Sequence, residues 1–244
     1  MLSIIIPVLN EAPGIAATLQ ALQKQGDGCE VIVVDGGSRD GTPALVRQFP
    51  VTLVERPNAP GGIAGHFNAA AQLARGDVLL FLHADVTLPP DTPALIAAAL
   101  RDPAVIGGGF RSRFDSDHWF LRFSSWHMNR RITRGQRGRL FYGDMGPFVR
   151  REVFARIGGY PAIAFMEDHA FAWRLMRTGP LAVIDAPLII SARRFREEGV
   201  VRTVLWAQWI KLLFYGGVPP ATLGPIYRGN TRRARRGAPS KDAG

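Results

Sequence analysis

The sequence contains a single cysteine, Cys29, and this scarcity excludes two classes of structure. An intramolecular disulfide needs two cysteines, so these 244 residues cannot form a disulfide-stabilised domain. A structural zinc site built on several thiolates is excluded for the same reason. A reducing compartment is therefore the simplest expectation.

Long apolar runs are also missing. A transmembrane helix needs about 18 or more consecutive apolar residues, and no window of the sequence provides them. Residues 1–7 are apolar, but the segment is short, lacks a basic start and meets Pro7, so we expect a buried strand rather than a signal peptide. With 47% hydrophobic and 20% charged residues, the chain suits one sizeable core and neither a disordered nor a membrane-embedded protein.

Acidic side chains are outnumbered, with 20 Asp and Glu against 30 Lys and Arg, and the formal net charge is +10. Such a charge suits nucleic acid, anionic lipid or an anionic small substrate. Much of the excess lies among Gly, Pro and Ser in residues 228–244, a composition typical of a disordered tail. Nucleic acid is not expected as a partner, because no aromatic residues alternate with these arginines. We expect a cytoplasmic protein, with an anionic membrane surface at the inner face of the cell membrane as a candidate partner.

Short apolar runs alternate with helical patterns in the first half, as in βαβ units. Strands are expected at 2–8, 30–34, 51–55 and 77–83, and helices at 13–23, 42–48, 65–74 and 91–101. In the second half, strands are expected at 105–114, 143–150 and 183–190, and helices at 119–131, 165–179 and 202–215. We predict an α/β, Rossmann-like fold with a mixed, mostly parallel sheet flanked by helices. It forms a single domain at 1–198, followed by an amphipathic helical extension at 199–227 and the basic tail at 228–244.

Polar residues gather where the expected parallel strands end, at Asn10-Glu11, at 35–38 and at 83–85. Ligands of open parallel sheets bind at this edge, where loops and helix N-termini converge. Asp35 can accept a hydrogen bond from a base or a ribose, and the glycines after it allow close backbone approach. Alternatively, Asp40-Gly41 makes a simple turn that Asp35 caps.

The segment His83-Ala84-Asp85 follows the most apolar strand. Because strand side chains alternate, a strand that ends in His-x-Asp places two potential metal ligands on the same side. Carboxylates with substrate phosphates commonly hold Mg²⁺, and a histidine fits Mn²⁺ better. Alternatively, Asp85 caps the helix near Pro89 and His83 packs against it.

Glu167-Asp168 is an adjacent pair of acids at an expected helix start. The helix dipole stabilises acids there without any catalytic role. Beside a ligand pocket, one of the two could instead act as a general base.

Taken together and in order, these segments resemble the family 2 glycosyltransferases, inverting nucleotide-sugar enzymes with the GT-A fold. The resemblance covers about three-quarters of the chain, through the segments 3–11, 35–42, 83–85, 143–151, 158–160 and 167–168. His83-Ala84-Asp85 and Ser191-Ala192-Arg193-Arg194-Phe195 are most similar to a small bacterial subgroup associated with radical-SAM or selenium-domain proteins.

The resemblance implies a role for each matching residue. Pro7, Asn10, Glu11, Asp35 and Gly37 would bind the nucleotide, with Asp35 holding the base, usually uracil. Asp85, with His83 as a candidate second ligand, would bind Mn²⁺ or Mg²⁺ at the diphosphate. Asp168 would be the general base, supported by Glu167, and Arg194 would steady the pyrophosphate.

Three departures from the family pattern qualify these roles. Gly36 stands where a second aspartate is usual, and His83 replaces the first acid of an Asp-x-Asp motif. Ser191 and Phe195 replace Gln and Trp in the last element, which argues against processive polymerisation.

The expected function is therefore an inverting, metal-dependent, hexosyltransferase-like enzyme that moves a sugar from a nucleoside-diphosphate sugar such as a UDP-sugar to a hydroxyl acceptor. Alternatives are a nucleotidyltransferase, an NAD-dependent oxidoreductase or a non-catalytic binding module. A glycine-rich dinucleotide fingerprint does not follow the first strand, where Asn10-Glu11 stands instead.

The expected helix at 202–215 has two interpretations. Its leucines and tryptophans suit a helix packed on the core, and they equally suit an interfacial helix on an anionic membrane, helped by Lys211 and the basic tail. The second interpretation fits a lipid-linked acceptor. The aromatic and basic segment 119–131 is likewise either core or a lid over the acceptor.

Overall fold

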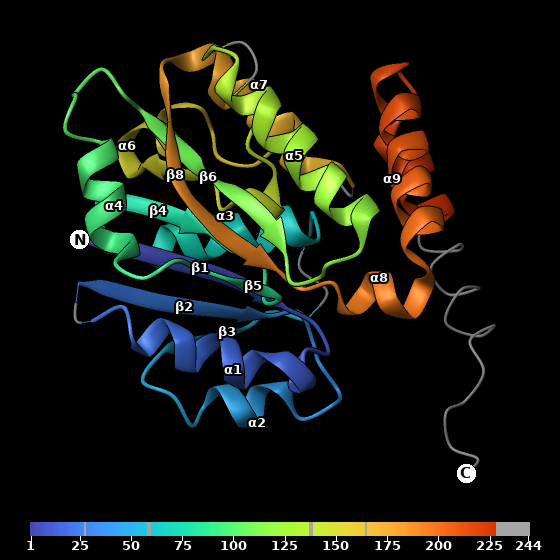
Figure 1. Ribbon diagram of the computed structural model, residues 1–244. Coiled ribbons are helices and arrows are strands. Elements are labelled where there is room, and N and C mark those ends of the chain that lie inside the picture. The colour runs from blue at the N-terminus through green and yellow to red at the C-terminus, as the bar shows by residue number, and fades with distance from the viewer. Residues whose placement is uncertain (27, 58–59, 137–138, 164, 228–244) are drawn as a thin grey trace.

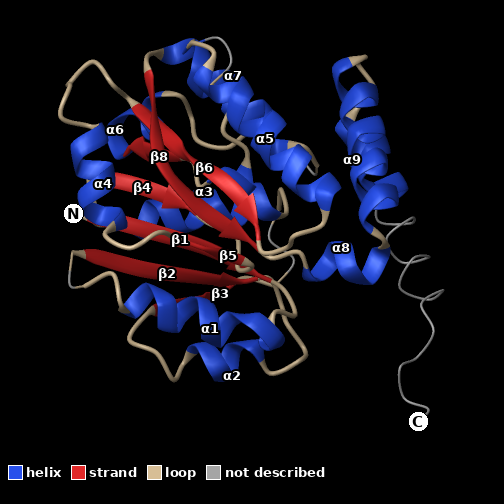
Figure 2. Cartoon of the chain, viewed as in Figure 1, coloured by secondary structure: helices blue, strands red, loops and turns tan. Residues whose placement is uncertain are grey.

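The central element is an eight-stranded mixed sheet with the strand order β3-β2-β1-β4-β7-β6-β8-β5 (Figures 1 and 2). The computed structural model describes residues 1–26, 28–57, 60–136, 139–163 and 165–227. The strands are β1 Leu2–Val8, β2 Cys29–Asp35, β3 Thr52–Glu55, β4 Val78–Phe81, β5 Val86–Thr87, β6 Gly107–Phe114, β7 Phe148–Arg150 and β8 Leu181–Ile190. The expected mixed α/β fold is confirmed.

Helices cover both faces of this sheet. They are α1 Ala12–Gln23, α2 Thr42–Val46, α3 Ile63–Leu73, α4 Thr92–Ala99, α5 Trp119–Thr133, α6 Arg151–Arg156, α7 Glu167–Thr178, α8 Arg193–Glu198 and α9 Val200–Tyr215, with the short 3₁₀ helix η2 at Gly143–Met145. Side chains from α1, α2 and α4 pack in the core on one face, and side chains from α3, α6 and α7 pack in the core on the other.

Parallel pairing brings the ends of β1 and β2 together. All seven residues of β1 are buried, as expected for a strand covered on both faces. Its register with β2 pairs Val8 with Asp35, and β4 lies parallel on the other side of β1. The loops that follow these three strands therefore meet at one edge of the sheet.

The strand β4 is shorter than predicted, and this changes the geometry at 83–85. It ends at Phe81, and His83 and Asp85 lie beyond it in a turn closed by a hydrogen bond of 3.3 Å from the Val86 amide to the His83 carbonyl. Val86 then pairs antiparallel with Ile190 in β8. Strand alternation therefore does not set the side on which His83 and Asp85 lie.

The segment 143–150 also differs from the expected single strand. Gly143–Met145 forms η2, and only Phe148–Arg150 pairs in the sheet. Gly146 between them has a φ of 53°, a left-handed conformation that breaks the extended chain.

The chain leaves the sheet through α8 into α9, which stands beside α5 (Figure 1). Within the described residues, no helix combines the length and the apolar character that crossing a bilayer requires. The helix expected at 202–215 is confirmed as α9, and the tail predicted at 228–244 lies outside the described residues.

Candidate active site

The loops after β1 and β2 are held together by hydrogen bonds between backbone and side chains. The Asn10 amide donates to Ser38 Oγ at 2.8 Å, and the Arg39 amide donates to Asn10 Oδ1 at 2.9 Å. The Glu11 amide donates to Thr42 Oγ1 at 2.9 Å. Asn10 adopts a φ of 56°, which an asparagine tolerates better than most residues. Its side chain therefore shapes the loop at the strand edge.

Asp35 is buried at the end of β2 and uses only one of its oxygens within the protein. Its Oδ2 accepts hydrogen bonds of 2.9 Å from the amides of Gly37 and Ser38. Its Oδ1 is buried and has no hydrogen-bond partner in the described structure. A buried acceptor without a partner is costly, so this oxygen is suited to a donor supplied by a ligand.

His66 on α3 lies beside the same loop. Its Nε2 is also buried without a partner among the described residues, and burial lowers the pKa of its imidazole. A Cβ built at Gly36 would lie 2.9 Å from His66 Cε1. The ring therefore occupies the space into which a side chain at position 36 would extend, which explains why glycine fits there. Pro7 lies one residue from the end of β1, opposite Val34, and Gly37 adopts a φ of 98° against Pro57.

His83 and Asp85 are the candidate metal ligands beyond β4. Asp85 is exposed, whereas His83 is half-buried against Gly143, where its ring would obstruct any Cβ. Over the part of the chain that the structure describes, no group of three or more His, Cys, Asp or Glu side chains is arranged to hold a metal ion. Mg²⁺ and Mn²⁺ sites of this kind often use one or two protein ligands and complete their coordination with substrate phosphates and water. The exposed carboxylate of Asp85 fits that arrangement.

Asp144 in η2 connects the metal candidates with the proposed base electrostatically. Burial raises the pKa of its carboxyl, the charges of Asp168 and Asp85 raise it further, and Lys211 and His83 oppose them. Asp85 also raises the pKa of Glu11, on which burial has the larger effect. Five acids from separate segments are therefore candidates for one shared site: Glu11, Asp85, Asp144, Glu167 and Asp168.

The acids Glu167 and Asp168 occupy the first turn of α7, as predicted. Asp168 Oδ1 accepts a hydrogen bond of 2.8 Å from the His169 amide, and its Oδ2 accepts one of 3.5 Å from the Gly143 amide. Burial, and then the charge of Asp168, raises the pKa of Glu167 from an ordinary 4.5 to about 7. A carboxyl that titrates near neutrality suits proton transfer, so both acids are candidates for the chemistry.

Arg194 and its neighbour Arg193 have different partners. The Arg194 guanidinium pairs with Glu198 at 3.3 Å and stacks 5.2 Å from the Tyr227 ring centroid. Arg193 instead donates to Glu11 Oε2 at 3.1 Å. Arg193 is therefore the arginine of this segment that contacts a predicted nucleotide-binding residue.

Aromatic and cationic side chains form a second cluster beside Asp168. The Tyr142 ring stacks on His169 with centroids 3.9 Å apart, and Arg131 and Lys211 lie 4.7 and 5.5 Å from its centroid. His169 Nδ1 and the Tyr215 hydroxyl share a hydrogen bond of 2.8 Å. Helices α5, α7 and α9 thus meet at the acidic site.

A separate hollow of about 840 Å³ lies at the opposite edge of the sheet, near the start of β4. Its arginines already have backbone partners, since Arg150 donates to the carbonyls of Leu100 and Val105, and Arg151 to that of Ala74. These groups stabilise the fold and offer little to a ligand, so we place the candidate active site at the acidic edge.

Comparisons with known proteins agree with this fold. The sequence profile of glycosyl transferase family 2 matches residues 3–158. The chain is 31% identical over 166 residues to the undecaprenyl-phosphate 4-deoxy-4-formamido-L-arabinose transferase of Aeromonas hydrophila, covering 63% of this chain and 50% of the relative. It therefore spans about half the length of that transferase.

Solved structures share the architecture. The mannosyltransferase PcManGT of Pyrobaculum calidifontis, in complex with GDP-Man and Mn²⁺, superimposes with a TM-score of 0.60 at 24% identity, over 96% of this chain and 72% of that one. S. aureus TarS in complex with UDP-GlcNAc does so with a TM-score of 0.63 at 18% identity, over 79% of this chain and 58% of that one. The fold is the GT-A fold, and the chain belongs to glycosyl transferase family 2.

Proposed function

We propose that the protein is an inverting, metal-dependent glycosyltransferase that moves a sugar from a nucleoside-diphosphate sugar to a hydroxyl acceptor. The observation that carries the proposal is the position of Gly143, whose amide donates to Asp168 Oδ2 at 3.5 Å and against which the ring of His83 packs. It supports a single site in which a metal-binding carboxylate and a general base act on the same substrate.

The donor nucleotide binds at the ends of β1 and β2. Asp35 Oδ1 and His66 Nε2 are both buried without partners among the described residues, so a base that pairs with them recovers the lost hydrogen bonds. Pro7, Asn10, Glu11 and Gly37 form the surrounding wall. Arg193 lies at the same edge through Glu11, and Arg194 reaches the pyrophosphate only by leaving Glu198.

A divalent cation, Mn²⁺ or Mg²⁺, would be held by Asp85, with His83 as a second candidate ligand. When bound, it would neutralise negative charge on the diphosphate leaving group. The protein holds the two side chains in a turn anchored by the hydrogen bond from the Ser191 amide to the Asp85 carbonyl, 2.9 Å long.

Asp168 accepts the proton of the acceptor hydroxyl at its carboxylate. The acceptor oxygen then bonds to the anomeric carbon as the bond to the diphosphate oxygen breaks on the opposite face, which inverts the configuration. The Gly143 and His169 amides orient Asp168. Glu167 sets the charge of the pair, because its pKa of about 7 leaves it partly protonated at neutral pH.

The acceptor is carried on a lipid, and the enzyme works in the cytoplasm at the periphery of the membrane. The name of the Aeromonas relative, an undecaprenyl-phosphate transferase, supports a lipid carrier. GDP-Man and UDP-GlcNAc in the two similar structures make GDP and UDP the nucleotides to test first.

Calorimetry tests the metal site. Asp85→Asn keeps the shape of the side chain and removes its charge, so we expect Mn²⁺-dependent binding of UDP or GDP to weaken by about ten- to a hundredfold. Asp102→Asn is the control, because the exposed Asp102 accepts a hydrogen bond from the Ala104 amide that asparagine preserves. Equal metal-dependent affinity in Asp85→Asn and in wild type would refute the metal assignment.

A further inference from the structure

One side of α9 exposes a stripe of apolar side chains, which Gln208 interrupts. Its members recur about every three to four residues, so they share a face of the helix. They are Val201, Leu205, Trp209, Leu212 and Tyr215, of which Leu205 is 58% exposed and Leu212 72% exposed.

The other side of α9 is apolar too. Ile210 is buried with Met166 and Leu223, and Leu213 and Phe214 pack against them. A helix at the surface of a globular protein normally turns polar residues to the solvent, whereas the exposed face of α9 is formed mostly by apolar side chains, with Arg202 and Gln208 as its exposed polar ones. One side of α9 is covered by this apolar cluster, and the exposed stripe on its other side indicates that a further partner binds there.

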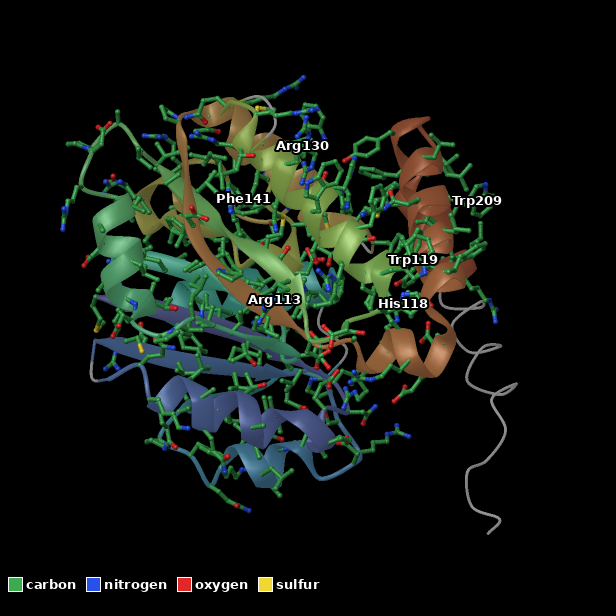
Figure 3. The ribbon with its side chains drawn as sticks, in the orientation of Figure 1. Arg113, His118, Trp119, Arg130, Phe141 and Trp209 are labelled. Carbon is green, nitrogen blue, oxygen red and sulfur yellow. The ribbon has the colours of Figure 1, made fainter. Side chains whose placement is uncertain are left out.

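The adjacent helix α5 has an exposed apolar stripe of its own. Trp119, Phe123 and Trp126 follow the same helical spacing and are more than half exposed. In Figure 3, Trp119 lies at the end of α5 nearest to α9, and Trp209 lies on the side of α9 away from the sheet. Since tryptophan carries both a large apolar ring and a polar N–H group, it is enriched where protein meets the surface of a bilayer.

The charges on the two helices have one sign. Neither α5 nor α9 contains an aspartate or glutamate, and the helices carry Arg122, Arg130, Arg131, Arg202 and Lys211. Arg130 lies 5.4 Å from the Trp126 ring centroid, so cation and aromatic ring are presented together. This combination complements anionic lipid headgroups above an apolar layer.

We infer that the exposed stripes of α9 and α5 form a docking surface for an anionic lipid bilayer. The inference deepens the proposed function and rests on it, because a lipid-linked acceptor is the reason for the enzyme to bind a membrane. The site lies close to this surface: the Tyr215 hydroxyl on α9 is hydrogen-bonded to His169, the residue after the proposed base, and Lys211 lies over the Tyr142 ring that stacks on His169. Docking here brings a lipid-linked hydroxyl to Asp168.

Two other binding partners for the exposed stripes are disfavoured: the C-terminal segment of the chain and a second copy of the chain. Residues 228–244 contain no large apolar side chain that could fill the stripe, and their arginines add to its positive charge. A second copy of the chain would bring the same cations face to face without an acid from either helix to pair with them.

Vesicle co-sedimentation with the full chain tests the inference. We expect binding to mixed vesicles of phosphatidylglycerol and phosphatidylcholine, weak binding to pure phosphatidylcholine, and a decrease as salt is raised. The double variant Leu205→Ser/Leu212→Ser should lower the affinity for mixed vesicles by at least about tenfold, because two buried leucines are lost from the bilayer contact. Its thermal midpoint should stay at the wild-type value, since both side chains are exposed.

Leu73→Ser is the matched control, because Leu73 is 54% exposed on α3 and belongs to neither stripe. Full vesicle binding by the double variant would overturn the inference. A wild-type dimer in sedimentation velocity that the double variant abolishes would also overturn it, in favour of a second copy. Nucleotide binding without vesicle binding would refute the docking surface alone, and vesicle binding without nucleotide binding would refute the proposed function alone.

Discussion

At the scale of single residues, the acid pair at the start of α7 makes the sharpest kinetic prediction. Asp168→Asn should reduce the turnover of sugar transfer by about 10²- to 10⁴-fold, since a general base is lost. Nucleotide affinity should stay within about twofold, because asparagine Oδ1 can still accept a hydrogen bond from a backbone amide. Initial rates together with calorimetry measure both quantities, and an active Asp168→Asn enzyme would remove Asp168 as the base.

Glu167 makes a prediction about stability. Its pKa is raised from 4.5 to about 7 in the folded protein, so the folded state binds its proton more tightly than the unfolded state does. This stabilisation is complete below pH 4.5 and is lost as the pH rises through about 7. Glu167→Gln stays neutral at every pH, so at pH 8 it should exceed the wild type in free energy of unfolding by about 2–3 kcal/mol.

Urea unfolding of the metal-free protein over this pH range checks the effect of Glu167→Gln. The difference should shrink as the pH falls towards 4.5 and vanish well below it, where the wild-type carboxyl is protonated in both the folded and the unfolded state. Glu197→Gln on the exposed surface of α8 is the control and should show no comparable gain. A pH-independent difference for Glu167→Gln would contradict the assigned pKa.

His66 makes a prediction about nucleotide recognition. If its unpartnered Nε2 contacts the base, His66→Phe should weaken nucleoside diphosphate binding by about two- to tenfold and change the ratio of UDP to GDP affinity. A purely structural role would lower the thermal midpoint and leave that ratio unchanged. His127→Phe on the exposed surface of α5 serves as the control for loss of an imidazole.

At the scale of elements, local sequence patterns predicted the strands and helices better than they predicted the contacts between these elements. The buried β1 and the helix α7 match their expected ranges within two residues at each end. The strand β4 stops two residues earlier than predicted, because the chain turns at His83 to pair through β5 with β8. Apolar character continues to Leu82, so local sequence gives no sign of that turn.

The candidate site was predictable where residues directly follow an element. Asp35 ends β2, and Glu167 and Asp168 begin α7, so their positions could be inferred from the pattern of strands and helices. Asp144, His66 and Arg193 join the site only through tertiary packing. Gly36 was the one sequence feature that pointed to a side chain packed beside Asp35, because a glycine leaves room for a ring from another element, here His66.

The attachment of α9 to the site makes the prediction at this scale. Tyr215→Phe removes the 2.8 Å hydrogen bond to His169, so α9 should open more easily, by about 1 kcal/mol, as measured by hydrogen exchange of its amides. Tyr160→Phe is the matched control, because the Tyr160 hydroxyl is buried without a partner and its removal breaks no hydrogen bond in the described structure. Faster exchange in the Tyr160 variant alone would contradict the prediction.

At the scale of the whole molecule, the candidate site lies at one edge of the sheet and the exposed apolar stripes lie on α5 and α9, while positive charge is concentrated toward the end of the sequence. Residues 228–244 contain six of the 30 Lys and Arg and one of the 20 Asp and Glu, so their removal lowers the formal net charge from +10 to +5. Surface charge acts mainly through long-range attraction that salt screens, whereas the apolar stripe acts only on contact.

Deletion of residues 228–244 should therefore distinguish electrostatic attraction to the membrane from insertion of the apolar stripe into it. We expect weaker binding to phosphatidylglycerol vesicles at low salt and a shallower dependence on salt, because about 1 kcal/mol is lost for each cation near the surface. Mn²⁺-dependent nucleotide affinity should persist, since the candidate ligands Asp35, Asp85 and Arg193 all precede residue 228. If the deletion abolished nucleotide binding as well, the tail would belong to the active site. The proposal that the tail only attracts the protein to the membrane would then be wrong.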